Sequence, residues 1–141
     1  MADIPVELLL CHAAATWAMA GLAWFVQVVH YPLFAGVGAQ GFADYEREHQ
    51  RRTGFVVVPA MLCEAACAGL LLLLAPRDPW VLAGAGLLAA IWISTFAVQV
   101  PLHARLASGF EPVAHRRLVA TSWLRTLGRS RGRPPGPGRR A

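Results

Sequence analysis

Long apolar segments alternate with short polar ones along this chain. Apolar residues predominate over residues 6–31, 55–75 and 80–103. Each segment is long enough to cross the hydrocarbon core of a bilayer, which takes about 20 helical residues. Small residues four positions apart, such as Ala65 and Gly69, offer faces for close helix packing. The pattern predicts an all-α fold, a small transmembrane helical bundle with three clear spans.

Proline and charge mark the end of the first span and the link that follows it. Pro32 predicts that the first helix ends at about Tyr31, because the residue before a proline is disfavoured in the helical conformation. Residues 42–52 are mostly polar and predict a short, separate amphipathic helix, in which Glu48 and Arg52 pair at i, i+4. We expect this link to be too charged to enter lipid.

The C-terminal part of the chain differs in character from the spans. Residues 113–128 predict a basic amphipathic helix that either lies at the membrane interface or begins a short fourth crossing. Residues 129–141 hold five Arg, three Pro and three Gly, a composition that predicts disorder. We therefore expect one domain, the bundle of residues 1–128, followed by a disordered Arg/Pro/Gly tail.

Composition and charge place the protein in a membrane. Hydrophobic residues make up 56% of the chain and charged residues 15%, well below the usual quarter in soluble domains. All 13 basic residues are Arg, and nine of them lie at or beyond Arg105. Such a tail favours anionic lipids of the bilayer as partners over any specific nucleic acid. A homo-oligomer is left open.

The distribution of arginines also predicts the orientation. The link between the first two spans and the C-terminal tail carry most of the positive charge. The positive-inside rule then places both in the cytoplasm and the N-terminus outside. We expect a multi-pass protein of the cell (plasma) membrane with a cytoplasmic C-terminus.

The three cysteines lie within apolar segments. Cys11, Cys63 and Cys67 form no CxxC pair, and their number is odd. We interpret them as small buried hydrophobic residues. Cys63 and Cys67 share a helix face at i, i+4, so ligation of a soft metal is a less favoured alternative.

The predicted topology gathers polar side chains at one end of the bundle. The end of span one, the start of span two and the end of span three all lie on the cytoplasmic side. Glu64 lies roughly 14 Å into the second span, where a carboxylate is costly and faces protein or a cavity. The polar residues expected to converge there are Gln27, His30, His49, Arg52, Glu64, Gln99 and His103.

This convergence predicts a candidate site. His30, His49, Glu64 and His103 are side chains of the kind that bind Fe, Zn or Cu. Glu64, His49 and His103 are the candidate catalytic residues, and the candidate substrate-binding residues are Gln27, Gln99, Arg52 and Arg125. Two alternatives stay open. The polar residues can serve as interhelical hydrogen bonds, each contributing roughly 0.6 kcal/mol, or Glu64 can relay protons.

Several short motifs carry a resemblance to a known family. They are Tyr31-Pro32-Leu33-Phe34, Tyr45…His49…Arg52, Pro59-x-Met61-x-x-Glu64, Gln99-Val100-Pro101-Leu102-His103 and Thr121-Ser122-Trp123-x-Arg125-Thr126. Over about residues 20 to 127 the chain resembles a family of small bacterial four-helix integral membrane proteins. That family is distantly similar to the anthrone-oxygenase-type membrane proteins, whose members oxidise polyketide anthrones. The chain departs from the family pattern at Ser122, where Asn is expected, and after Thr126, where a further apolar segment is expected.

Three hypotheses of function follow from these observations. The first is a membrane-embedded oxidoreductase, oxygenase-like, acting on a small apolar substrate. The second is a proton-coupled small-molecule binder or transporter that uses Glu64. It requires a second polar path to the outer face, for which the sequence offers only His12. The third is a non-catalytic membrane subunit or scaffold.

Overall fold

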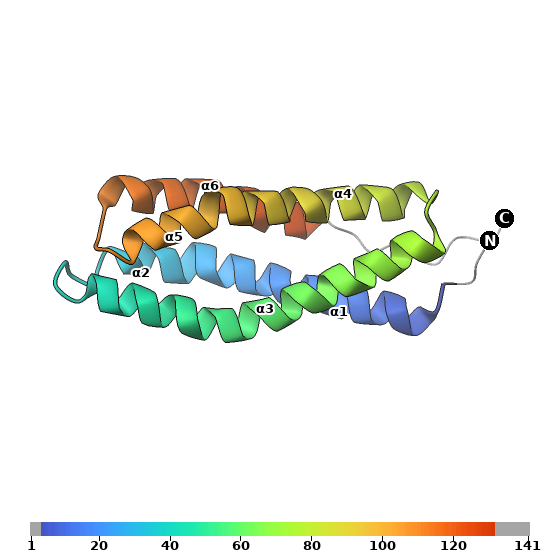
Figure 1. Cartoon of the computed structure of the whole chain (residues 1–141), viewed down its shortest axis with the longest axis horizontal. Helices are drawn as coiled ribbons and strands as arrows, with labels where there is room; N and C mark the ends of the chain where they lie inside the picture. Colours follow the sequence, from blue (N-terminus) through green and yellow to red (C-terminus); the bar gives the residue numbers. More distant parts are fainter. Residues whose placement is uncertain (1–3, 132–141) are drawn as a thin grey trace.

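Four antiparallel helical rods form the bundle (Figure 1). The computed structural model describes residues 4–131. The first rod consists of α1 (Val6–Phe25), the π-helical segment η1 (Val26–His30) and α2 (Tyr31–Phe34), and the second is α3 (Phe42–Leu74). The third consists of α4 (Pro79–Ser94), the π-helical segment η2 (Thr95–Gln99) and α5 (Val100–Leu106), and the fourth is α6 (Pro112–Arg131). The predicted all-α bundle is confirmed.

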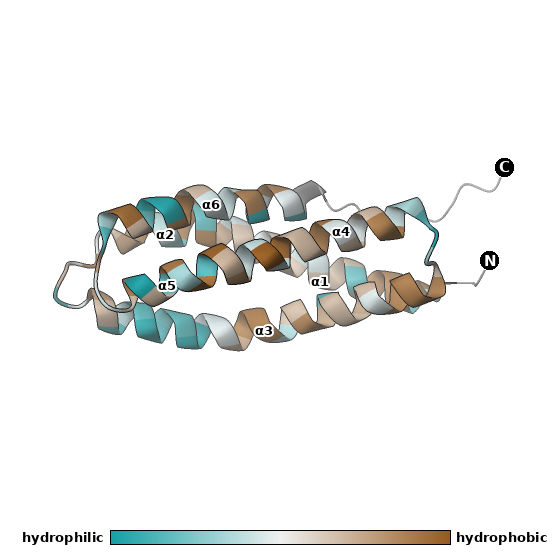
Figure 2. Ribbon diagram, turned by 45° about the horizontal axis from the view of Figure 1, so that its top comes forward, coloured by the Kyte–Doolittle hydropathy of each residue, from teal (hydrophilic) through white to brown (hydrophobic). Residues whose placement is uncertain are grey.

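Three of the rods are long and apolar enough to cross a membrane. They are Val6–Phe34, Phe42–Leu74 and Pro79–Leu106. Large apolar side chains stay exposed on the outside of the bundle, including Trp17, Phe55 and Ile93. Hydrophilic residues gather toward one end of the bundle, on the first turns of α3, on α5 and on α6, whereas the helices toward the other end are mainly hydrophobic (Figure 2). An apolar exterior of this extent is typical of a protein that is solvated by lipid.

The first and third rods continue through their prolines, which corrects the prediction that the first helix ends near Tyr31. In η1 the N–H of Tyr31 donates to the carbonyl of Val26, and in η2 the N–H of Val100 donates to the carbonyl of Thr95. These i→i+5 bonds lie immediately before Pro32 and Pro101. Since a proline cannot donate to the preceding turn, a π-helical turn lets the rod continue without a break.

The predicted separate link helix is also wrong, because residues 42–74 form one continuous helix, α3. Pro59 lies inside this helix without ending it. The expected pair of Glu48 and Arg52 is confirmed, with Arg52 Nε 2.5 Å from Glu48 Oε1. The charged first turns of α3 therefore extend the bundle beyond its most apolar part, and they carry polar side chains to the ends of α2 and α5.

Helix α6 runs back along the bundle from its start at Pro112 (Figure 1). Its buried side chains are Ala114, Leu118, Ser122, Thr126 and Arg129, whereas Leu124 and Leu127 are exposed. The small and polar side chains of α6 therefore face the other helices together with Leu118, whereas Leu124 and Leu127 face outward, as expected in lipid. Helix α6 packs along the three rods that precede it, but it is not among the candidate spans of the described residues. The two alternatives, a helix at the interface or a short fourth crossing, therefore both stay predictions.

The helix also extends beyond its predicted end at residue 128. Arg129 and Arg131 belong to α6, although disorder was predicted from residue 129. The rest of the predicted tail, and with it the expected contact with anionic lipids, lies outside the described residues.

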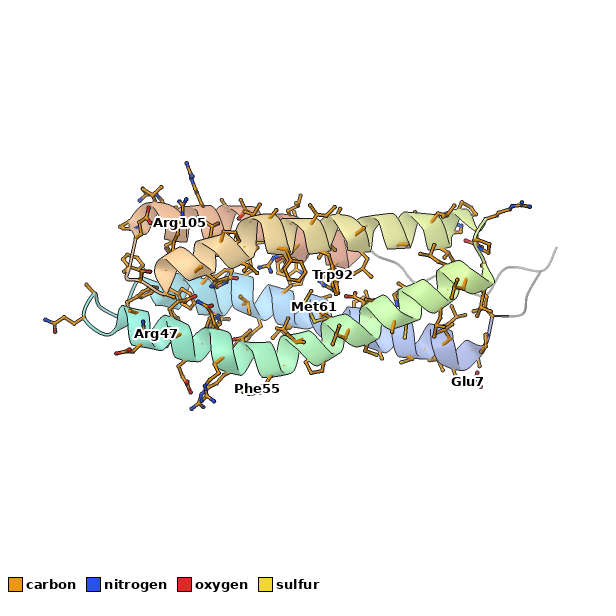
Figure 3. The ribbon with its side chains drawn as sticks, viewed as in Figure 1. Glu7, Arg47, Phe55, Met61, Trp92 and Arg105 are labelled. Carbon is orange, nitrogen blue, oxygen red and sulfur yellow. The ribbon has the colours of Figure 1, made fainter. Side chains whose placement is uncertain are left out.

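An aromatic cluster closes the end of the bundle at which α2, α3, α5 and α6 meet. Tyr31, Phe34, Phe42, Leu106 and Leu118 are all buried there. The ring centroids of Phe34 and Phe42 lie 5.8 Å apart in an edge-to-face arrangement. Arg47 and Arg105 lie at this end and Glu7 at the opposite end (Figure 3). The cluster holds the four rods in register directly beside the polar side chains described next.

Candidate functional site

A cavity of about 260 Å³ lies between the rods beside the aromatic cluster. One part of its wall is apolar, with side chains that include Met19, Leu22, Val57 and Met61. The other part is polar and consists of Tyr31, His49, Gln50, Thr53, Thr95, His103, Ser122, Arg125, Thr126 and Arg129. A mostly apolar chamber with a few converging polar groups is the usual form of a small-molecule site.

A chain of hydrogen bonds crosses the polar wall of this cavity. His103 Nδ1 donates to Glu46 Oε1 over 2.5 Å, and the hydroxyl of Tyr31 lies 3.2 Å from His103 Nε2. Because the carboxylate can only accept, Nδ1 carries the proton, and Nε2 is left to accept from Tyr31. Arg125 Nη2 in turn donates to the Tyr31 oxygen over 3.3 Å. The chain joins α3, α5, α2 and α6.

Glu46 is the most enclosed member of this chain. Its side chain is fully buried, and Gln50 Nε2 donates to the same carboxylate oxygen that binds His103, at 3.1 Å. The other oxygen, Oε2, has no partner among the described residues, and neither has Arg125 Nε. Buried polar atoms without partners are uncommon. Arg125 lines the cavity, so its Nε leaves hydrogen-bonding capacity there for water or for a ligand.

A pair of histidines, His30 and His49, lies next to this chain of hydrogen bonds. His30 Nε2 lies 2.8 Å from His49 Nδ1, and Thr53 Oγ1 lies 3.1 Å from the same nitrogen. His49 lines the cavity. Its other ring nitrogen, Nε2, has no side-chain partner among the described residues. The rings of His49 and His103 lie 5.8 Å apart between centroids. Two imidazoles therefore stand at one side of a single chamber.

The two predicted glutamines hold α6 against the π-helical segments. Gln99 Nε2 donates to Thr121 Oγ1 over 2.7 Å and Gln99 Oε1 accepts from Arg125 Nη2 over 3.3 Å. Gln27 Nε2 donates to the carbonyl of Val119 over 3.2 Å and its Oε1 accepts from Ser122 Oγ. Neither glutamine lines the cavity. Their position indicates that they orient α6, and Gln99 in particular positions Arg125.

Two of the predicted site residues lie elsewhere. Arg52 points outward and pairs with Glu48, because a guanidinium on an exposed face finds its partner one turn away. Glu64 pairs with Arg129 Nη1 over 2.5 Å, with both side chains almost fully buried. A carboxylate at that depth needs a cation, and α6 supplies one that the sequence pattern did not indicate.

The four predicted metal ligands therefore do not assemble as one group. His30, His49 and His103 are neighbours, but Glu64 belongs to a different cavity. Within the described part of the chain, only Cys11, Cys63 and Cys67 form a group of three or more His, Cys, Asp or Glu ligand atoms that lie within 4.8 Å of one another. We assign no chemistry of this cavity to a metal.

A smaller cavity of about 60 Å³ lies farther along the bundle. Its wall includes His12, Thr16, Glu64 and Arg129. His12 Nδ1 and Thr16 Oγ1 are buried and have no hydrogen-bond partner among the described residues. Arg129 lines both cavities, so its ion pair with Glu64 stands between them.

Sequence reasoning missed Tyr31 and Gln50 of the polar wall. It also missed Glu46, which lies behind the wall and bonds His103 and Gln50. One signal was present, because Glu46 precedes His49 by three positions and Gln50 by four, which places all three on one helix face. Tyr31 was hidden by the expectation that the helix ends there. With the rod continuing through η1 and α2, its hydroxyl reaches His103.

The geometry defines a four-helix bundle of membrane type with a polar-walled chamber near one end. Comparisons of the chain with protein families, with characterised proteins and with solved structures find no match. The resemblance to the anthrone-oxygenase-type membrane proteins stays a prediction that rests on the short motifs.

Proposed function

We propose that this protein is a membrane-embedded enzyme that transfers a proton to or from a small, largely apolar molecule bearing a hydroxyl or similarly acidic group. One observation carries the proposal: His103 lines the cavity between a buried carboxylate and the hydroxyl of Tyr31. A histidine fixed in this way is suited to general acid–base catalysis. The apolar wall suits a substrate that enters from lipid.

The proton step follows from the hydrogen-bond chain. Tyr31 gives its proton to His103 Nε2 as it takes a proton from the substrate, and the imidazolium so formed is stabilised by Glu46. Arg125 donates to the Tyr31 oxygen and stabilises negative charge that develops there. His49 supplies a second ring nitrogen in the chamber. In this arrangement Gln99 is a positioning residue that holds Arg125.

The resemblance directs this chemistry towards oxidation. Removal of a proton from an anthrone-like methylene or its enol gives an electron-rich anion. Dioxygen can then convert the methylene to a carbonyl with release of one water, which balances atoms and electrons. This oxygenase-like step is the finer part of the proposal and depends on the motifs listed in the sequence analysis.

The test uses the full chain in lipid nanodiscs with a tricyclic anthrone as the trial substrate. Binding is followed by ligand fluorescence and turnover by dioxygen uptake. The variants His103→Gln and Tyr31→Phe should lower turnover by about 100-fold or more while binding changes much less. His115→Gln is the matched control, because His115 bonds the Tyr31 carbonyl and does not line the cavity.

Three results would count against parts of the proposed enzyme mechanism. Full turnover in both His103→Gln and Glu46→Gln would remove the proposed acid–base group. If the anthrone binds but no oxygen is consumed, the oxygenase step is wrong while the binding site stands. Cellular activity that survives both changes would favour the third hypothesis, a non-catalytic membrane subunit.

A second candidate, proton-coupled transport, is favoured by the two cavities that share Arg129. Protonation of Glu64 would release Arg129 and open a polar path from the larger cavity to His12 and Thr16. This is the second polar path for which the sequence offered only His12. Proteoliposomes loaded with a pH-sensitive dye should show proton entry that Glu64→Gln alters and His115→Gln does not. Flux equal to that of empty vesicles would exclude this candidate.

A further inference from the structure

Three cysteine side chains meet between α1 and α3, away from the cavity. Cys63 and Cys67 lie one turn apart on α3, and Cys11 approaches them from α1. The Sγ atoms of Cys11 and Cys63 lie 3.7 Å apart, and all three sulfurs lie within 4.8 Å of one another. The prediction of three buried hydrophobic residues is wrong for Cys11 and Cys63, which are exposed, and right for Cys67. None of the three lines the larger cavity.

These distances match the spacing that a single metal ion imposes on three sulfurs. Metal–thiolate bonds are about 2.3 Å long, so three sulfurs around a trigonal ion stand about 4 Å apart. The three thiols therefore already lie close to a ligand arrangement, with two of them fixed by one helix.

The donor set selects a soft ion. Thiolates prefer Cu(I), Zn(II) and iron–sulfur clusters to hard cations such as Mg²⁺ or Ca²⁺. Zn(II) in structural sites takes four ligands, whereas the described residues supply three in this group. Cu(I) accepts three-coordinate thiolate sites and brings a single positive charge.

The cysteine cluster lies where a metal ion can reach it from outside the bundle. Cys11 is exposed and lies five residues after the first residue of α1, or roughly 8 Å along the helix. The cluster is therefore close to the end of the first rod at which α1 begins (Figure 1). A carrier molecule in the headgroup region can reach it without crossing the bundle.

We infer that Cys11, Cys63 and Cys67 form a binding site for one Cu(I) ion, separate from the proposed catalytic cavity. Binding replaces thiol protons with the metal, so up to three protons leave as three Cu–S bonds form and the ion keeps its oxidation state. Uptake should accordingly strengthen as the pH rises. The same chemistry would join the start of α1 to the second half of α3 and stiffen the bundle.

The test titrates the full-length protein in detergent, reduced and kept free of oxygen, with Cu(I) delivered from a chromophoric chelator. One equivalent should transfer to the protein, and copper X-ray absorption should report sulfur neighbours only. Each of Cys11→Ser, Cys63→Ser and Cys67→Ser should weaken binding at least tenfold. His12→Gln, next to Cys11 in the chain, is the matched control and should bind copper like the unchanged protein.

Several outcomes would overturn the site. They are copper uptake well below one equivalent, serine variants that bind copper as tightly as the unchanged protein, and a spectrum dominated by nitrogen or oxygen neighbours. A disulfide between Cys11 and Cys63 in the isolated protein, with no copper uptake after reduction, would identify a redox pair instead. A serine variant that unfolds is recognised by its circular dichroism and replaced by the corresponding alanine variant.

Discussion

At the scale of single residues, the pair of Glu64 and Arg129 is the clearest case of charge held inside the bundle. Both side chains are almost completely enclosed, and their closest atoms lie 2.5 Å apart. Removing two ions from water is costly, and their mutual attraction repays the cost only while both are present. Replacing either residue alone should therefore lower the free energy of unfolding far more than replacing both together.

The change that tests this is Arg129→Met, alone and together with Glu64→Leu. The single variant leaves a buried carboxylate without its cation and should lose about 3–5 kcal/mol of unfolding free energy. The double variant should recover most of that loss, because two apolar side chains of similar size replace both ions. Chemical unfolding in mixed micelles measures both. A double variant as unstable as the single one would contradict the pairing.

Ser122 is a smaller test at the same scale. Its hydroxyl donates to Gln27 Oε1, and the resemblance leads us to expect Asn at this position. Ser122→Ala removes the donor and should cost about 1 kcal/mol, whereas Ser122→Asn keeps a donor and should cost less. Thermal unfolding of the two variants decides between them. Ser108→Ala, on an exposed turn, is the control and should leave stability unchanged.

At the scale of elements, the two π-helical segments determine how the rods meet. Each precedes a proline and carries one glutamine that reaches α6. A π turn holds one more residue than an α turn, so it turns side chains towards new partners without shifting the helix on either side. Gln27 and Gln99 are buried for this reason, although most of their neighbours on the rods face outward.

Deleting one residue tests this account. Removal of Ala97 from η2 converts a π turn into an α turn and leaves α4 and α5 in register, so the bundle should fold while the bond of Gln99 to Thr121 is lost. Removal of Ala89, an equally exposed alanine in α4, turns everything after it by about 100° and should prevent folding. Circular dichroism and gel filtration in detergent compare them. Equal damage from both deletions would show that η2 has no such role.

Sequence patterns predicted the apolar helices better than the π-helical segments that connect their parts. The apolar segments gave the spans, since about 20 apolar residues have few alternatives to a membrane helix. The same patterns could not predict that the first and third rods continue as helices through Pro32 and Pro101. This continuity depends on π turns that the other helices stabilise. Likewise His49 and His103 were predicted for the site, whereas Glu46 was missed because its partner lies 57 positions away.

At the scale of the whole molecule, arginine is distributed unevenly between the two ends among the described residues that precede the last turns of α6. The end that holds the loop after α2 and the turn between α5 and α6 carries Arg47, Arg51, Arg52, Arg105, Arg116 and Arg117. The turn between α3 and α4, at the opposite end, carries Arg77. The positive-inside rule then predicts that the cavity lies near the cytoplasmic face.

Single cysteines test this orientation in a background with Cys11, Cys63 and Cys67 changed to alanine. Ser108→Cys lies at the arginine-rich end and Arg77→Cys at the other, and both positions are exposed. A membrane-impermeant maleimide should label Ser108→Cys in inside-out vesicles and Arg77→Cys in right-side-out vesicles. The reverse labelling pattern would show the opposite orientation, with the cavity near the outer face of the membrane. Labelling of both from one side would contradict the antiparallel bundle itself, because each rod separates these positions by its full length.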